Sequence, residues 1–269
     1  MPHVDDDLIY FALHGAAPLP TASAEGHVEF ASARVWYATY GNITGDAVVL
    51  LHGAFDNSED WGYQVPALVA SGHRAIVIDN RGRGRSTLGT EMLSYELMAS
   101  EVLAVMDALD ISKFSVVGWS DGATIALILA MQQPSRIASV FAFGGSMDLS
   151  GVKDVDPSMQ ILGHVFGRAK SDYARLSPEP AAFDVMRQRV DHMMRTQPNY
   201  TAPELAAIRT RVAIVVGKND EFIKPEHTDY LIRTIPGAQG VVLPNVSHFA
   251  MMQRPEEFNR AMLEFLDAR

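Results

Sequence analysis

The chain has 269 residues, of which 48% are hydrophobic, and this is enough for a single domain with a sizeable core. Its formal net charge of −10 disfavours nucleic acid or an acidic membrane surface as the main partner. It contains no cysteine, which excludes disulfides, thiolate metal sites and a cysteine nucleophile. The start of the chain is acidic and no apolar run is long enough to cross a membrane, so we expect a cytoplasmic protein.

Short apolar runs alternate with longer helical patterns, which is typical of a parallel sheet covered on both faces. Residues 27–30 and 34–40 instead alternate in polarity around a short turn, which predicts an antiparallel hairpin at the sheet edge. Residues 47–51 and 75–78 are continuously apolar, as in strands buried on both sides. Further strands are predicted at 113–118, 137–143, 212–217 and 240–243, and helices near 60–70, 94–109, 122–133, 225–235 and 255–267.

One long segment breaks this alternation. Residues 148–205 carry no strand pattern, and their helical patterns are rich in methionine and interrupted by prolines. The segment is predicted to be a small helical cap inserted between two parts of a core, residues 1–147 and 206–269. Met159 and Met193 are candidates for lining a substrate pocket, because a thioether adapts to varied apolar shapes. Packing of the insertion onto the core would explain these methionines equally well.

A G-x-S-x-G motif places Ser120 between the strand predicted at 113–118 and the helix predicted at 122–133. A turn this tight strains the serine backbone and needs small residues at Gly118 and Gly122, and it leaves the hydroxyl exposed above the sheet. Ser120 is therefore a candidate nucleophile. The alternative is an ordinary strand-to-helix turn with a solvated serine.

Further motifs follow other predicted strands. His52-Gly53-Ala54-Phe55 comes after the third strand, Asp220 after the seventh and His248 after the eighth. The chain order serine, aspartate, histidine is the one expected when such a turn recruits an acid and a base from later strand ends. The glycine-rich loop 79–86 lacks a Walker lysine and the Rossmann glycine spacing, which disfavours nucleotide binding.

With these motifs in this order, the sequence from about residue 27 onward resembles the α/β-hydrolase superfamily. The resemblance implies an α/β fold with a mostly parallel central sheet of about eight strands, helices on both faces and a small helical cap. It also implies that Ser120 is the nucleophile, His248 the general base and Asp220 the acid that orients the histidine. Glu221 and Asp148 compete with Asp220 for the last role.

The same resemblance assigns an oxyanion hole made of backbone N–H groups. One donor is Asp121, which directly follows the serine, and the other is Ala54 or Phe55. The elbow Gly-Trp-Ser-Asp-Gly also resembles that of the valacyclovir-hydrolase group, also called biphenyl hydrolase-like, in which the acidic residue meets a substrate ammonium group. This makes the side chains of Asp121 and Trp119 candidate substrate contacts.

Asp121 has a second interpretation that involves no substrate. Its carboxylate could cap the following helix or pair with an arginine such as Arg81 or Arg85. In that case the residue would be structural.

We therefore expect a serine hydrolase that cleaves a small carboxylic ester, thioester or lactone through an acyl-enzyme, with no cofactor or metal. The partner would be a small-molecule substrate, without nucleic acid or membrane, and the chain would act as a monomer or homodimer. One alternative is hydrolysis of a carbon–carbon bond or a small N-terminal peptide by the same residues. Another is a non-catalytic ligand-binding scaffold. The complete set of candidate residues argues against that scaffold, but fold and triad do not identify a substrate.

Overall fold

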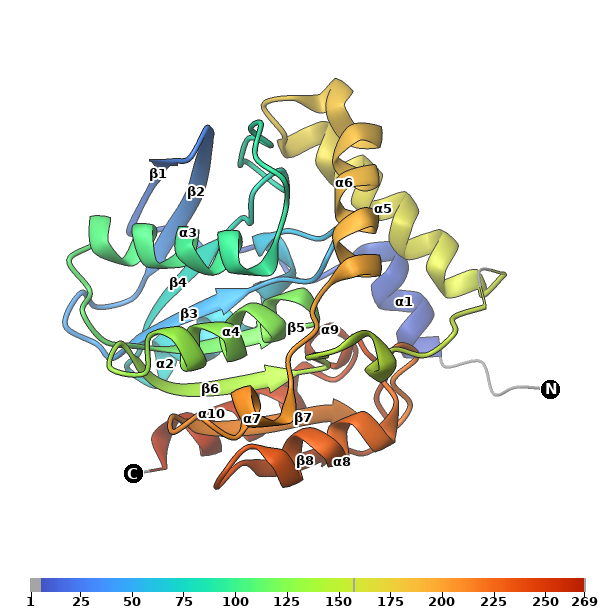
Figure 1. The fold of residues 1–269 in the computed structure, drawn as a ribbon. Coiled ribbons are helices and arrows are strands. Elements are labelled where there is room, and N and C mark those ends of the chain that lie inside the picture. Colours follow the sequence, from blue (N-terminus) through green and yellow to red (C-terminus); the bar gives the residue numbers. More distant parts are fainter. Residues whose placement is uncertain (1–5, 157, 269) are drawn as a thin grey trace.

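Eight strands form one sheet in the computed structural model, which describes residues 6–156 and 158–268 (Figure 1). Their order across the sheet is β1-β2-β4-β3-β5-β6-β7-β8, with β1, β2 and β4 paired antiparallel and all other neighbours parallel. The strands are β1 (Ala24–Phe30), β2 (Ala33–Tyr40), β3 (Ala47–Leu51), β4 (Arg74–Ile78), β5 (Phe114–Trp119), β6 (Ile137–Phe143), β7 (Arg211–Gly217) and β8 (Gln239–Leu243). The predicted fold class is confirmed.

The predicted hairpin is present and occupies the edge of the sheet. Its register runs from Ala24 opposite Thr39 to Phe30 opposite Ala33, so β1 begins three residues earlier than the alternation indicated. The turn between the strands places Ala31 and Ser32 at positive φ, which matches the tight connection of a two-residue hairpin.

Alternate side chains of the central strands enter two different cores. Val49 and Leu51 of β3 face the core beneath α3 (Tyr95–Ala108), α4 (Asp121–Gln132) and α8 (Pro225–Thr234). Val48 and Leu50 face the opposite core, beneath α2 (Gln64–Ala70) and α10 (Pro255–Asp267). Because both faces are covered, the strand is apolar at every position.

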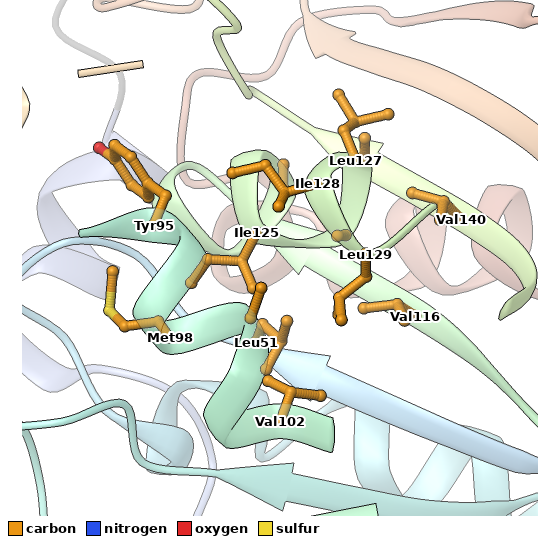
Figure 2. Packing of buried hydrophobic residues seen from close by; sticks show 14 of the residues in the cluster. Leu51, Tyr95, Met98, Val102, Val116, Ile125, Leu127, Ile128, Leu129 and Val140 are labelled. Atoms are coloured by element: carbon orange, nitrogen blue, oxygen red, sulfur yellow. The ribbon is translucent and has the colours of Figure 1, made fainter. Parts of the chain in front are cut away.

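Helix α4 lies at the centre of the first core (Figure 2). Its side chains Ile125 and Leu129 lie between the strand residues Leu51 and Val116 and the neighbouring helix α3. This packing fixes the direction in which α4 leaves the sheet, and hence the position of the turn that precedes it.

The segment between β6 and β7, residues 144–210, is helical. It contains η2 (Leu149–Gly151), α5 (Gln160–Leu176), η3 (Pro180–Ala182), α6 (Phe183–Thr196) and α7 (Ala202–Leu205). Helices α5 and α6 stand above the carboxyl ends of the parallel strands (Figure 1). The loops that carry the candidate site residues meet at the same edge, because parallel strands all end there.

Two short helices were not predicted, α1 (Asp6–His14) and α9 (Ala250–Gln253), and the helix predicted near 60–70 is divided into η1 (Ser58–Trp61) and α2. Helix α1 has only nine residues, of which Phe11 and Ala12 are buried, and a segment this short gives little periodicity to recognise. Among the residues that the structure describes, none of the helices combines the length and apolar character needed to span a membrane.

Candidate active site

Ser120 occupies a strained turn between β5 and α4. Its φ and ψ are 55° and −116°, values that a residue with a side chain rarely adopts. The turn is possible because its flanking glycines have no Cβ: one on Gly118 would lie 2.2 Å from the Gly122 carbonyl oxygen, and one on Gly122 would lie 2.1 Å from that of Leu51. The G-x-S-x-G spacing thus reflects backbone contacts on both sides of the serine.

His248 and Asp220 form a buried pair at the ends of β8 and β7. The Nδ1 atom of His248 lies 2.8 Å from Asp220 Oδ2, and the two residues are only 4% and 3% exposed. The other carboxylate oxygen, Oδ1, accepts the backbone N–H groups of Phe222 and Ile223, each at 2.8 Å. With both oxygens engaged, Asp220 holds one orientation of the imidazole.

The pair favours its charged form. Burial by itself would raise the pKa of Asp220, but the neighbouring His248 and the three hydrogen bonds bring that pKa below its usual value. Burial likewise acts to lower the pKa of His248, and the Asp220 carboxylate outweighs it, so this pKa is raised above 6.5. Asp220 therefore stabilises the imidazolium, and it keeps Nδ1 protonated in the neutral ring so that Nε2 is free to accept a proton.

The two competing carboxylates have other partners. Glu221 accepts the backbone N–H of His248 at 3.0 Å and so holds the loop, not the ring. Asp148 lies 3.6 Å from the Nδ1 atom of His227, a different buried histidine. Of the three candidates, only Asp220 bonds to the imidazole of His248.

Aromatic residues surround His248. The indole N–H of Trp119 donates to the His248 carbonyl oxygen at 2.8 Å, and the Phe222 ring centroid lies 4.7 Å from that of the imidazole. The backbone of Gly144 also lies against the imidazole, since a Cβ there would be 2.8 Å from the His248 Cε1 atom. Through its hydrogen bond, Trp119, the residue before the candidate nucleophile, supports the loop of the candidate base.

A cavity of about 380 Å³ joins these elements. Ser120, His248 and Trp119 line it together with Phe55. All the α5 side chains that line it are apolar: Leu162, Val165, Phe166 and Ala169. The predicted pocket residue Met193 lies elsewhere, fully buried in the core beneath α4, and Met159 is also absent from the described lining residues. The neighbouring Met194, on the next face of α6, lines the cavity in their place.

The loop after β3 carries the other predicted backbone donors. Ala54 and Phe55 line the cavity, and no hydrogen bond within the described residues uses either N–H group. His52 is fully buried below them; its Nδ1 bonds to the Gly53 carbonyl at 2.7 Å, and its Nε2 accepts the Asn80 N–H at 2.9 Å. Burial lowers the pKa of His52 to about 4, so this histidine stays neutral and shapes the turn.

Asp121 follows Ser120 as the first residue of α4, and its side chain lies at the cavity wall. Tyr95 donates its hydroxyl to Oδ1 at 2.8 Å, while the buried Oδ2 has no hydrogen-bond partner within the described structure. Burial raises the pKa of Asp121, and the nearby Arg83 charge only partly counters this. The two arginines that the sequence suggested as partners of Asp121 pair with other carboxylates. Arg81 pairs with Glu101, and Arg85 pairs with Glu59 and Asp79.

The glycine-rich loop 79–86 is occupied by its own contacts. The Asp79 carboxylate accepts the backbone N–H groups of Ser58 and Arg85, each at 2.8 Å. Arg81 and Arg83, which belong to the same loop, are fully buried. The loop therefore offers no open cradle for a phosphate. In the described part of the chain, no three His, Asp or Glu side chains are grouped so that they could hold a metal ion.

Comparison with known proteins identifies the family of this chain. Residues 48–261 match the family described as "Alpha/beta hydrolase family". The match spans most of the sequence, and the chain belongs to this family.

Two curated relatives show the range of activities in the family. "Putative non-heme bromoperoxidase BpoC" of Mycobacterium tuberculosis is 29% identical over 250 residues, covering 83% of this chain and 95% of that protein. The 2-hydroxy-6-oxononadienedioate/2-hydroxy-6-oxononatrienedioate hydrolase of Paraburkholderia xenovorans is 26% identical, covering 82% of this chain and 86% of its own.

Two solved structures have the same fold. Est816, described as an N-acyl homoserine lactone degrading enzyme, is 27% identical with a TM-score of 0.72, covering 89% of this chain and all of its own. The enol-lactonase of Burkholderia xenovorans superimposes equally well at a TM-score of 0.72, over 90% of this chain and all of its own, but is only 20% identical and supports the fold alone.

Proposed function

We propose that the protein is a serine hydrolase that cleaves a small carboxylic ester, thioester or lactone through an acyl-enzyme intermediate. The observation that carries the proposal is the hydrogen bond between His248 and Asp220 at the same cavity as the strained Ser120. Membership of the hydrolase family supports a hydrolytic reaction, and the buried acid–base pair supports the serine mechanism.

In this mechanism the Ser120 oxygen attacks the carbonyl carbon while His248 Nε2 takes the hydroxyl proton. The backbone N–H of Asp121, with that of Ala54 or Phe55, stabilises the oxyanion of the tetrahedral intermediate. Collapse of the intermediate breaks the bond to the leaving group, which receives the proton from His248. Water then attacks the acyl-enzyme in the same way and regenerates the free serine.

The charges of the cavity favour neutral or cationic substrates over anionic ones. Asp56 and Asp121 both line it, and the exposed Arg195 is the only lysine or arginine among the described lining residues. Burial raises the pKa of Asp56 to about 6, so this carboxylate still carries most of its charge at pH 7. The Asp56 carboxylate would repel the doubly anionic substrates that the name of the Paraburkholderia hydrolase specifies. Carbon–carbon bond cleavage therefore remains the second candidate.

We further propose that the helices within residues 148–205 form a cap and that Trp119 and Asp121 contact the substrate. Asp121 belongs to the cavity lining and its Oδ2, although buried, has no hydrogen-bond partner within the described structure; such a carboxylate suits a substrate ammonium group that reaches it, as in an aminoacyl ester. Met194 replaces the two predicted methionines in this proposal, because it is the methionine that lines the cavity.

A panel of p-nitrophenyl esters tests the function. Wild type should hydrolyse short neutral esters, and Ser120→Ala should lower kcat by several orders of magnitude without loss of folding. Ser146→Ala is the matched control, because Ser146 also lines the cavity but lies outside the elbow. A serine-directed phosphonate should label wild type once per chain, at Ser120.

The same panel separates the alternatives. An active Ser120→Ala variant would contradict the nucleophile assignment, and absence of any hydrolysis or labelling in wild type would favour a ligand-binding scaffold. Aminoacyl esters should react faster than their des-amino analogues, and Asp121→Asn should reduce this preference by about one to two powers of ten, as loss of a charge-assisted hydrogen bond predicts.

A further inference from the structure

Helix α1 lies behind two walls of the cavity. It packs against α5 and α9, beside the yellow helix α5 in Figure 1. Its buried residues Phe11 and Ala12, each 1% exposed, belong to the same apolar cluster as Leu162, Val165 and Phe249. Those last three residues also line the cavity. A single layer of side chains thus separates α1 from a substrate bound in the cavity.

Phe11 reaches the loop of the candidate base. Its ring centroid lies 4.8 Å from that of Phe249, the residue that directly follows His248. Phe249 in turn meets the His248 ring edge-on at 5.7 Å and the Trp119 ring at 5.8 Å. A continuous set of aromatic contacts therefore connects α1 with the imidazole.

Arg168 connects α1 with the cap helix α5. Its guanidinium donates to the Phe11 carbonyl oxygen and lies 5.7 Å from the centre of the Phe11 ring. The same side chain lies 3.6 Å from the Asp60 carboxylate and is only 14% exposed. Arg168 thus holds α1, α5 and η1 together at one point, through a carbonyl, a ring and a carboxylate.

Helix α1 depends on this docking for its own structure. It has nine residues, and an isolated helix of this length is marginal in water. Tyr10 and Leu13 are 61% and 54% exposed. The half-buried Leu8, in contrast, packs against the same apolar cluster as Phe11, and Asp7 forms an ion pair with Arg254. The helix also lies before residue 48, where the match to the hydrolase family begins. Phe11 is therefore the largest fully buried side chain that attaches to the core an element that the family match does not include.

We propose that Phe11 and Arg168 are positioning residues of the site: they hold α5 and the His248 loop at a fixed separation and thereby determine which acyl groups the cavity accepts. This inference rests on the proposed function. Loss of the Phe11 ring would let α5 and the loop move apart, so the cavity would fit a given acyl chain less closely. A loosened wall should weaken binding and selectivity more than it slows the chemical step.

The test compares Phe11→Ala with Tyr10→Ala, a matched aromatic deletion on the exposed face of the same helix. Both are assayed on p-nitrophenyl esters from acetate to octanoate, and amide hydrogen exchange is measured in residues 160–176 and 245–253. Phe11→Ala should raise KM about tenfold or more for the preferred ester, with a smaller change in kcat. It should also flatten the dependence on chain length, which for a closely fitting pocket is about fourfold per methylene.

Exchange should be faster in both segments for Phe11→Ala and unchanged for Tyr10→Ala. Phe11→Leu should restore most of the wild-type selectivity. Arg168→Gln should reproduce the loss of selectivity, and it provides the test if Phe11→Ala does not fold. Unchanged KM, selectivity and exchange in a Phe11→Ala protein with a lowered Tm would overturn the inference and leave α1 as structural support only. If wild type hydrolyses no ester, the proposed function fails, and the exchange rates alone decide whether α1 holds the two segments.

Discussion

At the scale of single residues, Asp220 divides its hydrogen bonds between two tasks. Oδ2 meets the imidazole of His248, while Oδ1 accepts the N–H groups of Phe222 and Ile223, which belong to its own loop. The backbone bonds orient the carboxylate, and the carboxylate then orients the ring. An amide at this position would present an N–H group to one of these donors and would break the arrangement.

We predict that Asp220→Asn lowers kcat by about three to four powers of ten, because the imidazole loses its orientation and its preferred tautomer. His248 must be neutral to accept the serine proton, so kcat/KM should fall as the pH drops through its raised pKa, above 6.5. In Asp220→Asn the falling limb should shift to lower pH, because the group that raises the pKa of His248 is gone. Measured pH profiles with Glu221→Gln and Asp148→Asn as controls check this, and equal losses in all three would refute the choice of acid.

The candidate site was predictable where its chemistry follows from local backbone geometry. Gly118 and Gly122 identify the elbow, because the turn has no room for side chains at these positions. The pocket wall was not predictable, because neighbouring residues of one helix face different surroundings: Met193 enters the core and Met194 lines the cavity. That difference depends on how α6 is rotated, which follows from tertiary packing and not from methionine content.

At the scale of elements, the turn after β6 is as constrained as the elbow. Gly144 has a φ of +63°, and a Cβ there would lie 2.9 Å from His248 Nδ1 and 3.3 Å from Asp220 Oδ2. Gly237, before β8, has a φ of +76° but no heavy atom within 4 Å of its would-be Cβ. The two glycines share the backbone conformation and differ in what surrounds them.

Substitution of each by alanine separates backbone strain from displacement of the histidine. Backbone strain should cost each variant about 1 kcal/mol of unfolding free energy, because alanine is disfavoured at positive φ, and Gly144→Ala should lose more because its methyl group also crowds the buried His248 ring. Only Gly144→Ala should also lose activity, by about two powers of ten, since a displacement of the imidazole on the order of 1 Å misaligns it. Denaturant unfolding and ester hydrolysis measure the two effects. Similar activity in both variants would show that the His248 loop tolerates the methyl group.

The elements themselves were predictable to different degrees. The central strands and α3, α4, α8 and α10 were found within two residues of their ends, because apolar runs and helical periodicity persist over their whole length. Helix α1 was missed because it is only nine residues long and is held in place by tertiary contacts such as that of Phe11 with Phe249. The same holds for α9, whose four residues are all buried and show no polar face.

At the scale of the whole molecule, Arg81 connects three parts of the fold that lie far apart in the sequence. Its guanidinium bonds to Glu101 of α3 at 2.5 Å and to the carbonyl oxygens of Phe30 and Ala31 in the edge hairpin, at 3.0 and 2.9 Å. The Arg81 and Glu101 side chains are 0% and 2% exposed. Burial raises the pKa of Glu101 even beside this arginine, as expected where desolvation opposes the charged form.

We predict that Glu101→Gln destabilises the protein by about 3–5 kcal/mol, because it leaves the buried Arg81 charge without a counter-ion. The double variant Arg81→Met with Glu101→Leu should be more stable than the single one, since it removes both charges, although it forfeits the bonds to the hairpin carbonyls. Glu29→Gln is the control: its ion pair with Arg34 is 3.1 Å long, but the Glu29 side chain is 77% exposed, so the change should be within about 1 kcal/mol. Urea unfolding of the three variants measures these differences. A Glu101→Gln protein as stable as Glu29→Gln would mean that Arg81 holds the hairpin through its carbonyl bonds alone and does not need the carboxylate of α3.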